Sequence, residues 1–171
     1  MTDTWDVKKV NEDLLRKFQK IQTELFTCET VTELCEKLLQ QMGNEFNIPF
    51  VWMTLIDEPA TTYLKKELLV SPYLAERLNL VNREVFTAIV GENTFPVLAN
   101  ENVNAFYRLL PGNTKYFIKS FAVCPFAFGN GVAGSLNCGD PSATRYQPGM
   151  DTTLLRNLIQ KVSTRLAYFI V

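Results

Sequence analysis

The most reactive side chains of this 171-residue chain are four cysteines, which stand far apart at Cys28, Cys35, Cys124 and Cys138. No two of them form the C-x-x-C pair typical of zinc sites and redox disulfides, and the chain contains no histidine. Serine or cysteine nucleophiles paired with histidine, histidine metal sites and a histidine general base are therefore excluded. The thiol chemistry that remains is disulfide exchange, which needs two cysteines within reach of each other.

Cys124 and Cys138 fall in the stretch around which the rest of the chain is organised, a predicted antiparallel hairpin. Two apolar runs, 120–128 and 132–138, flank Gly129-Asn130-Gly131, which tolerates the positive φ of a tight turn. Both runs are apolar at nearly every position, which favours a sheet covered on both faces, or covered on one and lining a cavity on the other. Pairing Cys124 with Leu136 puts the two cysteines diagonally adjacent on one face, whereas a one-residue shift separates them.

Three amphipathic helices are predicted to cover this hairpin, two at the start of the chain and one at its end. The first covers 4–26, the second begins at the capping-box pair Thr30 and Glu33 and runs to about residue 46, and the third covers 155–169. One heptad position of the first helix is occupied by Val7, Leu14, Ile21 and Cys28. This helix can therefore pack on its own sheet or against the same helix of a second copy.

The middle of the chain consists of short elements joined by turns. Residues 50–56 indicate the first strand, 62–70 a weaker, edge-like strand, and 73–80 a helix behind Ser71-Pro72. A short helix is bounded by Asn82 and Gly91, and an extended piece over 94–98 precedes a helix capped by Asn100 or Asn102. Because such segments vary most readily in shape, we expect 61–114 to cover a binding cavity.

The charges of the chain are nearly balanced. Its 17 basic and 18 acidic side chains are spread along the sequence, so we expect no nucleic-acid partner and no anionic membrane partner. No apolar run is long enough to span a bilayer, and the first residues lack the pattern of a signal peptide. We therefore expect one cytoplasmic domain, 1–171, with reduced thiols, in which 1–28 form a helix that can dimerise and 30–171 form the core.

The order of these elements resembles that of a GAF domain. The segment 30–57 is similar to the opening helix and strand of that family. The line from Gly134-Ser-Leu-Asn-Cys-Gly-Asp-Pro through Arg145-Tyr-Gln-Pro-Gly-Met-Asp-Thr-Thr resembles a narrower bacterial GAF-like family of unknown function, whose members carry G-S-x-D and then R-[FY]-x-P-x-M-x-T. Cys138 stands where that pattern usually has glycine or another small residue.

This resemblance implies an α+β fold with α/β/α layers. A central antiparallel sheet of about six strands would carry the N- and C-terminal helices on one face and short helices and loops over the other. GAF domains commonly bind small molecules under that second layer and signal through terminal helices that dimerise. The resemblance therefore implies a non-catalytic small-molecule-sensing or regulatory domain, without metal or cofactor, that forms a homodimer through its terminal helices.

A pocket of this kind would be lined from the first strand, the middle segment and the hairpin. The expected ligand-binding residues are Trp52, Thr54, Phe95, Arg108, Tyr116 and Ser120. Arg108 would act as a bidentate donor to a carboxylate or phosphate, and the small residues Ser120, Ala122 and Cys124 would leave room for the ligand. Alternatively, bulky helix side chains fill that room, and the chain is an architectural dimerisation module with a self-filled pocket.

Other GAF activities match the residues less well. Tetrapyrrole-binding members hold their chromophore with histidine, which is absent here, and the N-K-F-D-E set of cyclic-nucleotide members has no matching spacing. A further alternative is a thiol redox enzyme like the free methionine sulfoxide reductase, which would use Cys124 and Cys138. Neither cysteine has a cationic neighbour in the sequence, and the cysteine-bearing loop of that enzyme has no match in 101–115.

Overall fold

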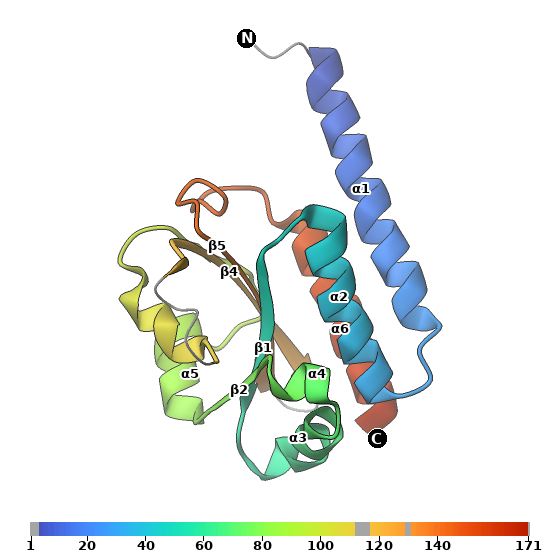
Figure 1. Cartoon of the computed structure of the whole chain (residues 1–171), viewed down its shortest axis with the longest axis vertical. Coiled ribbons are helices and arrows are strands. Elements are labelled where there is room, and N and C mark those ends of the chain that lie inside the picture. The colour runs from blue at the N-terminus through green and yellow to red at the C-terminus, as the bar shows by residue number, and fades with distance from the viewer. Residues whose placement is uncertain (1–3, 112–116, 129–130, 171) are drawn as a thin grey trace.

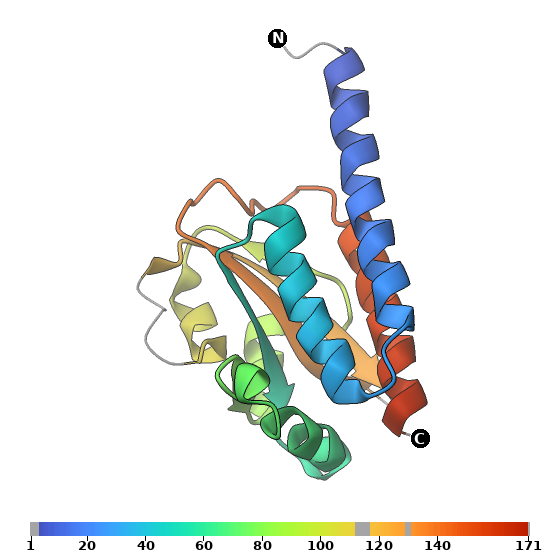
Figure 2. The same cartoon turned by 45° about the vertical axis from the view of Figure 1, so that its right-hand side comes forward.

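The computed structural model describes residues 4–111, 117–128 and 131–170, and it has three layers (Figure 1). Five strands form one sheet in the order β2-β1-β5-β4-β3: β1 (Phe50–Ile56), β2 (Leu78–Val81), β3 (Val97–Ala99), β4 (Ser120–Phe128) and β5 (Gly131–Asp140). One face carries α2 (Val31–Phe46) and α6 (Thr153–Ile170), with α1 (Thr4–Phe26) packed outside them (Figure 2). The other face carries α5 (Arg83–Val90) and the 3₁₀ helix η2 (Val103–Leu109), which together we call the cover.

The predicted hairpin is confirmed, and it lies at the centre of the sheet. β4 pairs with β5 in antiparallel fashion and in the register that sets Cys124 opposite Leu136, with a shift between Phe126 and Ala127. β5 also pairs with β1, and β4 with β3, so both hairpin strands are interior. Gly129 and Asn130 of the predicted turn lie outside the described residues. Interior position with a layer on each face explains why both strands are apolar at nearly every residue.

One edge of the sheet corrects the expectation of an all-antiparallel layer of about six strands. β2 runs parallel to β1, and the Met53 N–H donates to the Arg77 carbonyl at 2.8 Å. Parallel neighbours need a crossover connection, which is supplied here by α3 (Thr62–Leu69) and α4 (Pro72–Ala75). The predicted strand over 62–70 is therefore wrong, because this segment is the helix α3. The predicted helix over 73–80 is helical only to Ala75, where α4 ends, and its last three residues belong to the edge strand β2.

The helix at 62–69 has a clear physical cause. Leu64 and Leu68, four residues apart, are buried in the helix-side core, whereas Lys66 is exposed. Lys65 reaches Asp57, at the end of β1, with 3.0 Å between Nζ and Oδ1. The charges that suggested an exposed strand edge therefore lie on the outer face of an amphipathic helix.

Two of the predicted helix caps are confirmed. The Thr30 hydroxyl accepts the Glu33 N–H at 3.1 Å at the start of α2, and the Asn82 side chain accepts the Val85 N–H at 2.8 Å at the start of α5. Gly91 ends α5 with φ of 92°, a conformation that favours glycine. These caps fix where each helix begins relative to the sheet.

Alternate strand residues divide the interior into two cores. The helix-side core joins α1, α2 and α6 to strand residues that include Met53, Ala122, Cys124, Leu136 and Cys138. The cover-side core lies between the sheet and the cover, and it consists of Trp52, Ile56, Phe86, Val90, Leu109, Leu110, Ile118, Phe121, Val123 and Val132. This second core occupies the side on which the resemblance to GAF domains implies a ligand.

Candidate functional site

Aromatic rings fill the space between the sheet and η2. Phe121 of β4 is fully buried at their centre. Its ring centroid lies 5.6 Å from that of Phe106 in a stacked arrangement, 5.9 Å from Tyr107 and 6.1 Å from Trp52, the last two edge-on. These separations are those of directly packed rings. The four side chains therefore occupy much of the room that a ligand beneath the cover would need.

A buried polar network ties the cover to this core. The carbonyl oxygen of Leu109, at the end of η2, accepts hydrogen bonds from Trp52 Nε1 at 2.8 Å and from the Thr54 hydroxyl at 3.0 Å. The Asn137 amide is hydrogen-bonded with the hydroxyls of Thr54 and Ser135, at 2.8 and 2.7 Å. The strand members of the network are at most 3% exposed. Because satisfied buried polar groups are costly to separate, the network holds η2 against β1.

Trp52 and Thr54 are the two predicted site residues that the structure brings together. Ser120 corrects the prediction, because the strand register puts it on the opposite face. Asn137 pairs with both Trp52 and Val123, so the odd-numbered residues of β4 share the face of Trp52. The Ser120 hydroxyl instead donates to the Ser142 carbonyl at 2.7 Å.

The remaining predicted site residues lie apart from Trp52. Phe95 is half exposed, and its ring lies beneath the Arg156 guanidinium of α6, 4.1 Å from the ring centroid to Cζ. Arg108 is exposed, and it contacts β2 through its backbone, where its carbonyl accepts from Asn79 Nδ2 at 2.8 Å. Tyr116 lies outside the described residues. The predicted set therefore does not line one cavity.

The face of small residues on β4 packs against the helices. Ala122 and Cys124 belong to the helix-side core, where side chains of α2 and α6 such as Leu38 and Val162 are fully buried. The alternative interpretation, that helix side chains fill this room, is therefore confirmed. Small residues suit this face because α6 packs directly on β4.

Sequence reasoning missed Ser135 and Asn137, the other two strand members of the polar network. The signal was present, because two polar residues stand two positions apart in a strand that is otherwise apolar and small. Period-two spacing puts both side chains on one face of the sheet. In a strand paired on both sides, such a pair must find partners within the protein.

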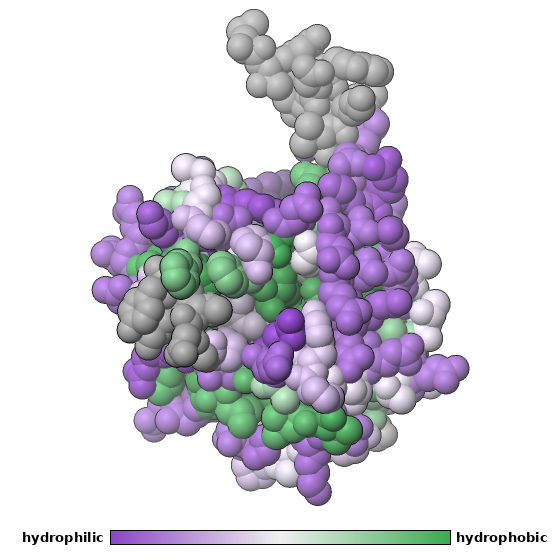
Figure 3. All heavy atoms as spheres, viewed as in Figure 1, coloured by the Kyte–Doolittle hydropathy of each residue, from purple (hydrophilic) through white to green (hydrophobic). Residues whose placement is uncertain are grey.

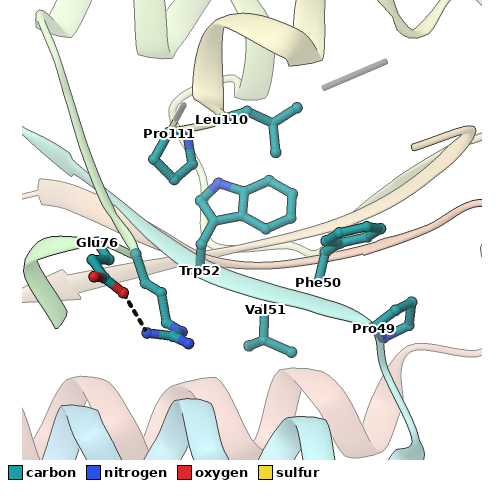
Figure 4. A pocket seen from close by; sticks show the side chains of 8 residues that line it. Pro49, Phe50, Val51, Trp52, Glu76, Leu110 and Pro111 are labelled. Atoms are coloured by element: carbon teal, nitrogen blue, oxygen red, sulfur yellow. Dashed lines mark ion pairs between the residues drawn. The ribbon is translucent and has the colours of Figure 1, made fainter. Parts of the chain in front are cut away.

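A pocket of about 260 Å³ lies at the rim of the cover-side core (Figure 4). It is lined from the start of β1, the residues before β2 and the end of η2 by Pro49, Phe50, Val51, Trp52, Glu76, Arg77, Leu110 and Pro111. We call it the β1 notch, because β2 begins opposite Met53 and, among the described residues, no strand pairs with the first residues of β1 on that side. Sequence reasoning placed only Trp52 in a site, since Glu76 and Arg77 fell inside a predicted helix.

The environment of Cys124 and Cys138 disfavours the thiol-enzyme alternative. The observed register does place both on one face, diagonally adjacent. Both are free and buried, and burial raises the pKa of Cys138 to about 12 and that of Cys124 well above its ordinary value. Arg145 opposes the shift at Cys138 without overcoming it. An attacking thiolate needs the opposite, a lowered pKa and access to the substrate.

We expect all four thiols to be unreactive in the folded chain. Cys28, Cys35, Cys124 and Cys138 are each at most 2% exposed, so a thiol-specific disulfide reagent at pH 8 should label them only after unfolding. Absorbance during labelling, with and without denaturant, measures this. Rapid native labelling of Cys124 or Cys138, or a disulfide formed on adding methionine sulfoxide, would contradict the expectation and restore the redox alternative.

Arg145, from the motif of the narrower family, has a structural role. Its Nη2 donates to the Phe46 carbonyl at 2.6 Å, and its Nη1 to Asp140 Oδ2 at 3.3 Å. The other oxygen of Asp140 accepts the Ser142 N–H at 2.7 Å. Charge-assisted bonds of this kind join the end of α2 to the loop after β5, so the motif fixes how the helix layer meets the sheet.

The known proteins to which this chain is similar are solved structures. No protein-family model and no curated protein matches the chain, so the narrower family stays a prediction. The GAF domain of an Acinetobacter phosphoenolpyruvate-protein phosphotransferase is similar, with TM-score 0.60, 15% identity, and coverage of 91% of this chain and 93% of that one. So is the GAF domain of a protein described as a sensor histidine kinase from Pseudomonas syringae pv. tomato, with TM-score 0.59, 12% identity, and coverage of 97% and 95%.

These likenesses concern the fold, because both identities are low. With TM-scores of 0.60 and 0.59 over more than nine tenths of this chain, they support a GAF-like fold. Among the described residues, no helix combines the length and apolar character needed to cross a membrane.

Proposed function

We propose that this chain, which has the GAF fold, is a regulatory domain that acts as a dimer through its terminal helices and holds no ligand beneath its cover. The observation that carries the proposal is the cover-side core, which is packed with aromatic rings and closed by the hydrogen bonds to the Leu109 carbonyl. The similar solved domains belong to a phosphotransferase and to a protein described as a sensor histidine kinase, which supports a regulatory role.

The first helix offers the output element. α1 has 23 residues and α2 has 16, so at 1.5 Å per residue α1 is longer by about 10 Å. Its N-terminal part runs past the ends of α2 and α6 in both views (Figures 1 and 2). Ile21 and Leu25, in its second half, are buried in the helix-side core, whereas Leu15 is 43% exposed. A helix anchored at one end and extended at the other can join a second copy.

A groove of about 480 Å³ between α1 and α6 supports this dimer. It is lined by Leu15, Phe18, Gln19, Gln22, Leu154, Asn157, Gln160, Lys161 and Thr164. Three of these side chains, Leu15, Phe18 and Leu154, are large and apolar, which suits packing against another helix. The occupant we propose is the α1 helix of a second copy, in a two-fold arrangement in which each groove receives the partner's helix.

Leu15→Glu is expected to dissociate this dimer. Two leucines are lost per dimer and each contributes at least about 1.5 kcal/mol when buried, so the dissociation constant should rise about 100-fold or more. Sedimentation velocity from 1 to 100 μM measures the effect, with circular dichroism to show that the fold is kept. Val70→Glu is the matched control, because Val70 is an exposed apolar residue, 77% accessible, outside this groove.

The wild type is expected to sediment with twice the mass of one chain. A monomeric wild type throughout this range would sink the dimer proposal, as would a Leu15→Glu variant that dimerises like the wild type. Dissociation by Val70→Glu would place the interface on another surface.

A further inference from the structure

In the β1 notch, backbone groups of β1 that would pair with a neighbouring strand are left open. The N–H groups of Met53 and Asp57 donate to β2 or its flanking residues at 2.8 Å, so odd-numbered residues of β1 face that side. Val51 therefore points its N–H and C=O the same way, where the described residues form no strand. The turn after α4 diverts the chain, because the Arg77 N–H donates to the Leu74 carbonyl at 2.9 Å. Within the described ranges, the Val51 peptide groups on this side have no hydrogen-bond partner, so they form a short open strand edge.

A positioned cation stands beside this edge. The guanidinium of Arg77 lies over the Tyr73 ring, with Cζ 3.8 Å from the ring centroid, and Nη1 donates to the Tyr73 carbonyl at 2.9 Å. Glu76 is its charged neighbour, with 3.7 Å between Oε2 and Nη1, but the Glu76 side chain is 79% exposed and such a pair is weak. Stacking on Tyr73 thus orients Arg77, and its Nε and Nη2 make no hydrogen bond to any described residue. A fixed guanidinium edge of this kind suits a carboxylate.

The other wall of the notch is apolar. Figure 4 shows Trp52 directed toward Leu110 and Pro111 on one side of β1, and Val51 directed to the opposite side. Arg77 also lines the notch, with its guanidinium held on Tyr73. An extended segment along the β1 edge would therefore alternate between an apolar wall and a basic one. This combination of free backbone, apolar wall and cation matches strand addition by a peptide.

We propose that the β1 notch binds the C-terminal end of an extended peptide, which pairs with Val51 as a short parallel strand and places its terminal carboxylate against Arg77. A peptide beside residues 50–52 that runs parallel to β1 would lie in line with β2 and in front of its first residue. The C-terminus of this peptide would then lie next to Arg77, so its carboxylate meets the guanidinium. An antiparallel segment would bring a repelled ammonium there instead. Residues 50–52 span roughly 10 Å, which admits two or three peptide residues.

The test uses the full chain with Trp5→Phe, so that Trp52 becomes the single tryptophan and can be excited selectively over the tyrosines. The probe is an acetylated Ala-Leu-Ala peptide with a free C-terminal carboxylate, compared with the same peptide as its C-terminal amide. The carboxylate form should quench or shift Trp52 emission on titration, and the amide form should bind at least tenfold more weakly. Calorimetry on the wild type provides a second readout.

Two variants test whether Arg77 binds the C-terminal carboxylate of the peptide. Arg77→Gln should weaken the carboxylate peptide about tenfold and leave the amide peptide unchanged, whereas Arg108→Gln, an exposed arginine of η2, should change neither. Methylation of the peptide nitrogen that faces the Val51 carbonyl should weaken binding with no change to the protein.

Three results would overturn the proposal. They are equal binding of the carboxylate and amide peptides, no binding of the carboxylate peptide at millimolar concentration, and binding of N-acetylalanine as tight as that of the tripeptide, which would make the notch a site for small carboxylates. None of these depends on the dimer, so this proposal and the proposed function fail separately. If Arg77→Gln does not fold, the comparison of the two peptides on the wild type still decides.

Discussion

Phe121→Ala is expected to lower the free energy of unfolding by about 3–5 kcal/mol. Phe121 is fully buried and packs against three aromatic rings, on Trp52, Phe106 and Tyr107. Truncation removes the transfer free energy of the ring and leaves a cavity, because the Leu109 hydrogen bonds hold η2 in place and prevent collapse. The effect is large because this ring is fully buried in the cover-side core, on the side where a GAF-like ligand was expected.

Urea unfolding followed by circular dichroism measures this change, and Phe117→Ala is the matched control. Phe117 is the same residue type four positions earlier, but it is 65% exposed, so its truncation should change stability by no more than about 0.5 kcal/mol. A loss below about 1 kcal/mol for Phe121→Ala would mean that the space beneath the cover is loosely filled.

Gly134→Ala should destabilise the fold by about 3 kcal/mol or more. A Cβ at residue 134 would overlap the carbonyl oxygen of Thr54 and lie 2.9 Å from the ring of Phe126. The first of these is backbone of the paired strand β1, opposite β5, and it cannot move without disturbing the ladder. The chain therefore has glycine here because the two strands and a buried ring meet at this point.

Gly131→Ala, three residues earlier on the same strand, is the control for this substitution. No atom of the described residues lies within 4 Å of its Cβ position, and its φ is not in the left-handed region, so the exchange should be neutral or stabilising by up to about 1 kcal/mol. Thermal and urea unfolding of both variants separate the steric effect from the general effect of replacing glycine. Equal stabilities of the two variants would contradict the packing around Gly134.

The elements predicted correctly are those whose signals are local. The hairpin follows from two apolar runs around a glycine turn, and the starts of α2 and α5 follow from Thr30 and Asn82, whose side chains accept the amides expected of them. The capping residues and turn residues act on atoms within a few positions, so tertiary contacts do not change their meaning.

The edge strand β2 and the helix α3 before it could not be predicted from local signals. Leu78–Val81 is a strand because the backbone of β1 offers it partners, such as the Met53 N–H that bonds to Arg77, and no local pattern records that. Likewise, Leu64 and Leu68 fit both a short strand and a helical face until the position of α2 is known. Tertiary contacts decide such short segments.

The candidate site was predictable only in part. The shared strand face of Trp52 and Thr54 follows from period-two spacing, and both side chains do meet, at the Leu109 carbonyl. The face of Ser120 depended on a register that the sequence left open, and Arg77 became visible as a notch residue only once α4 was seen to end before β2. Hence the filled interior and the open rim were both findings of the structure.

Hydrogen exchange of the Trp52 indole N–H tests most directly whether the cover is closed on a filled core. This proton bonds to the Leu109 carbonyl in a side chain that is 3% exposed. In the Trp5→Phe chain, NMR should show that it exchanges only through global unfolding, with an exchange free energy equal to that from urea unfolding. Exchange within minutes under native conditions, while the β4–β5 amides stay protected, would show that the cover opens over a hollow and would contradict the account.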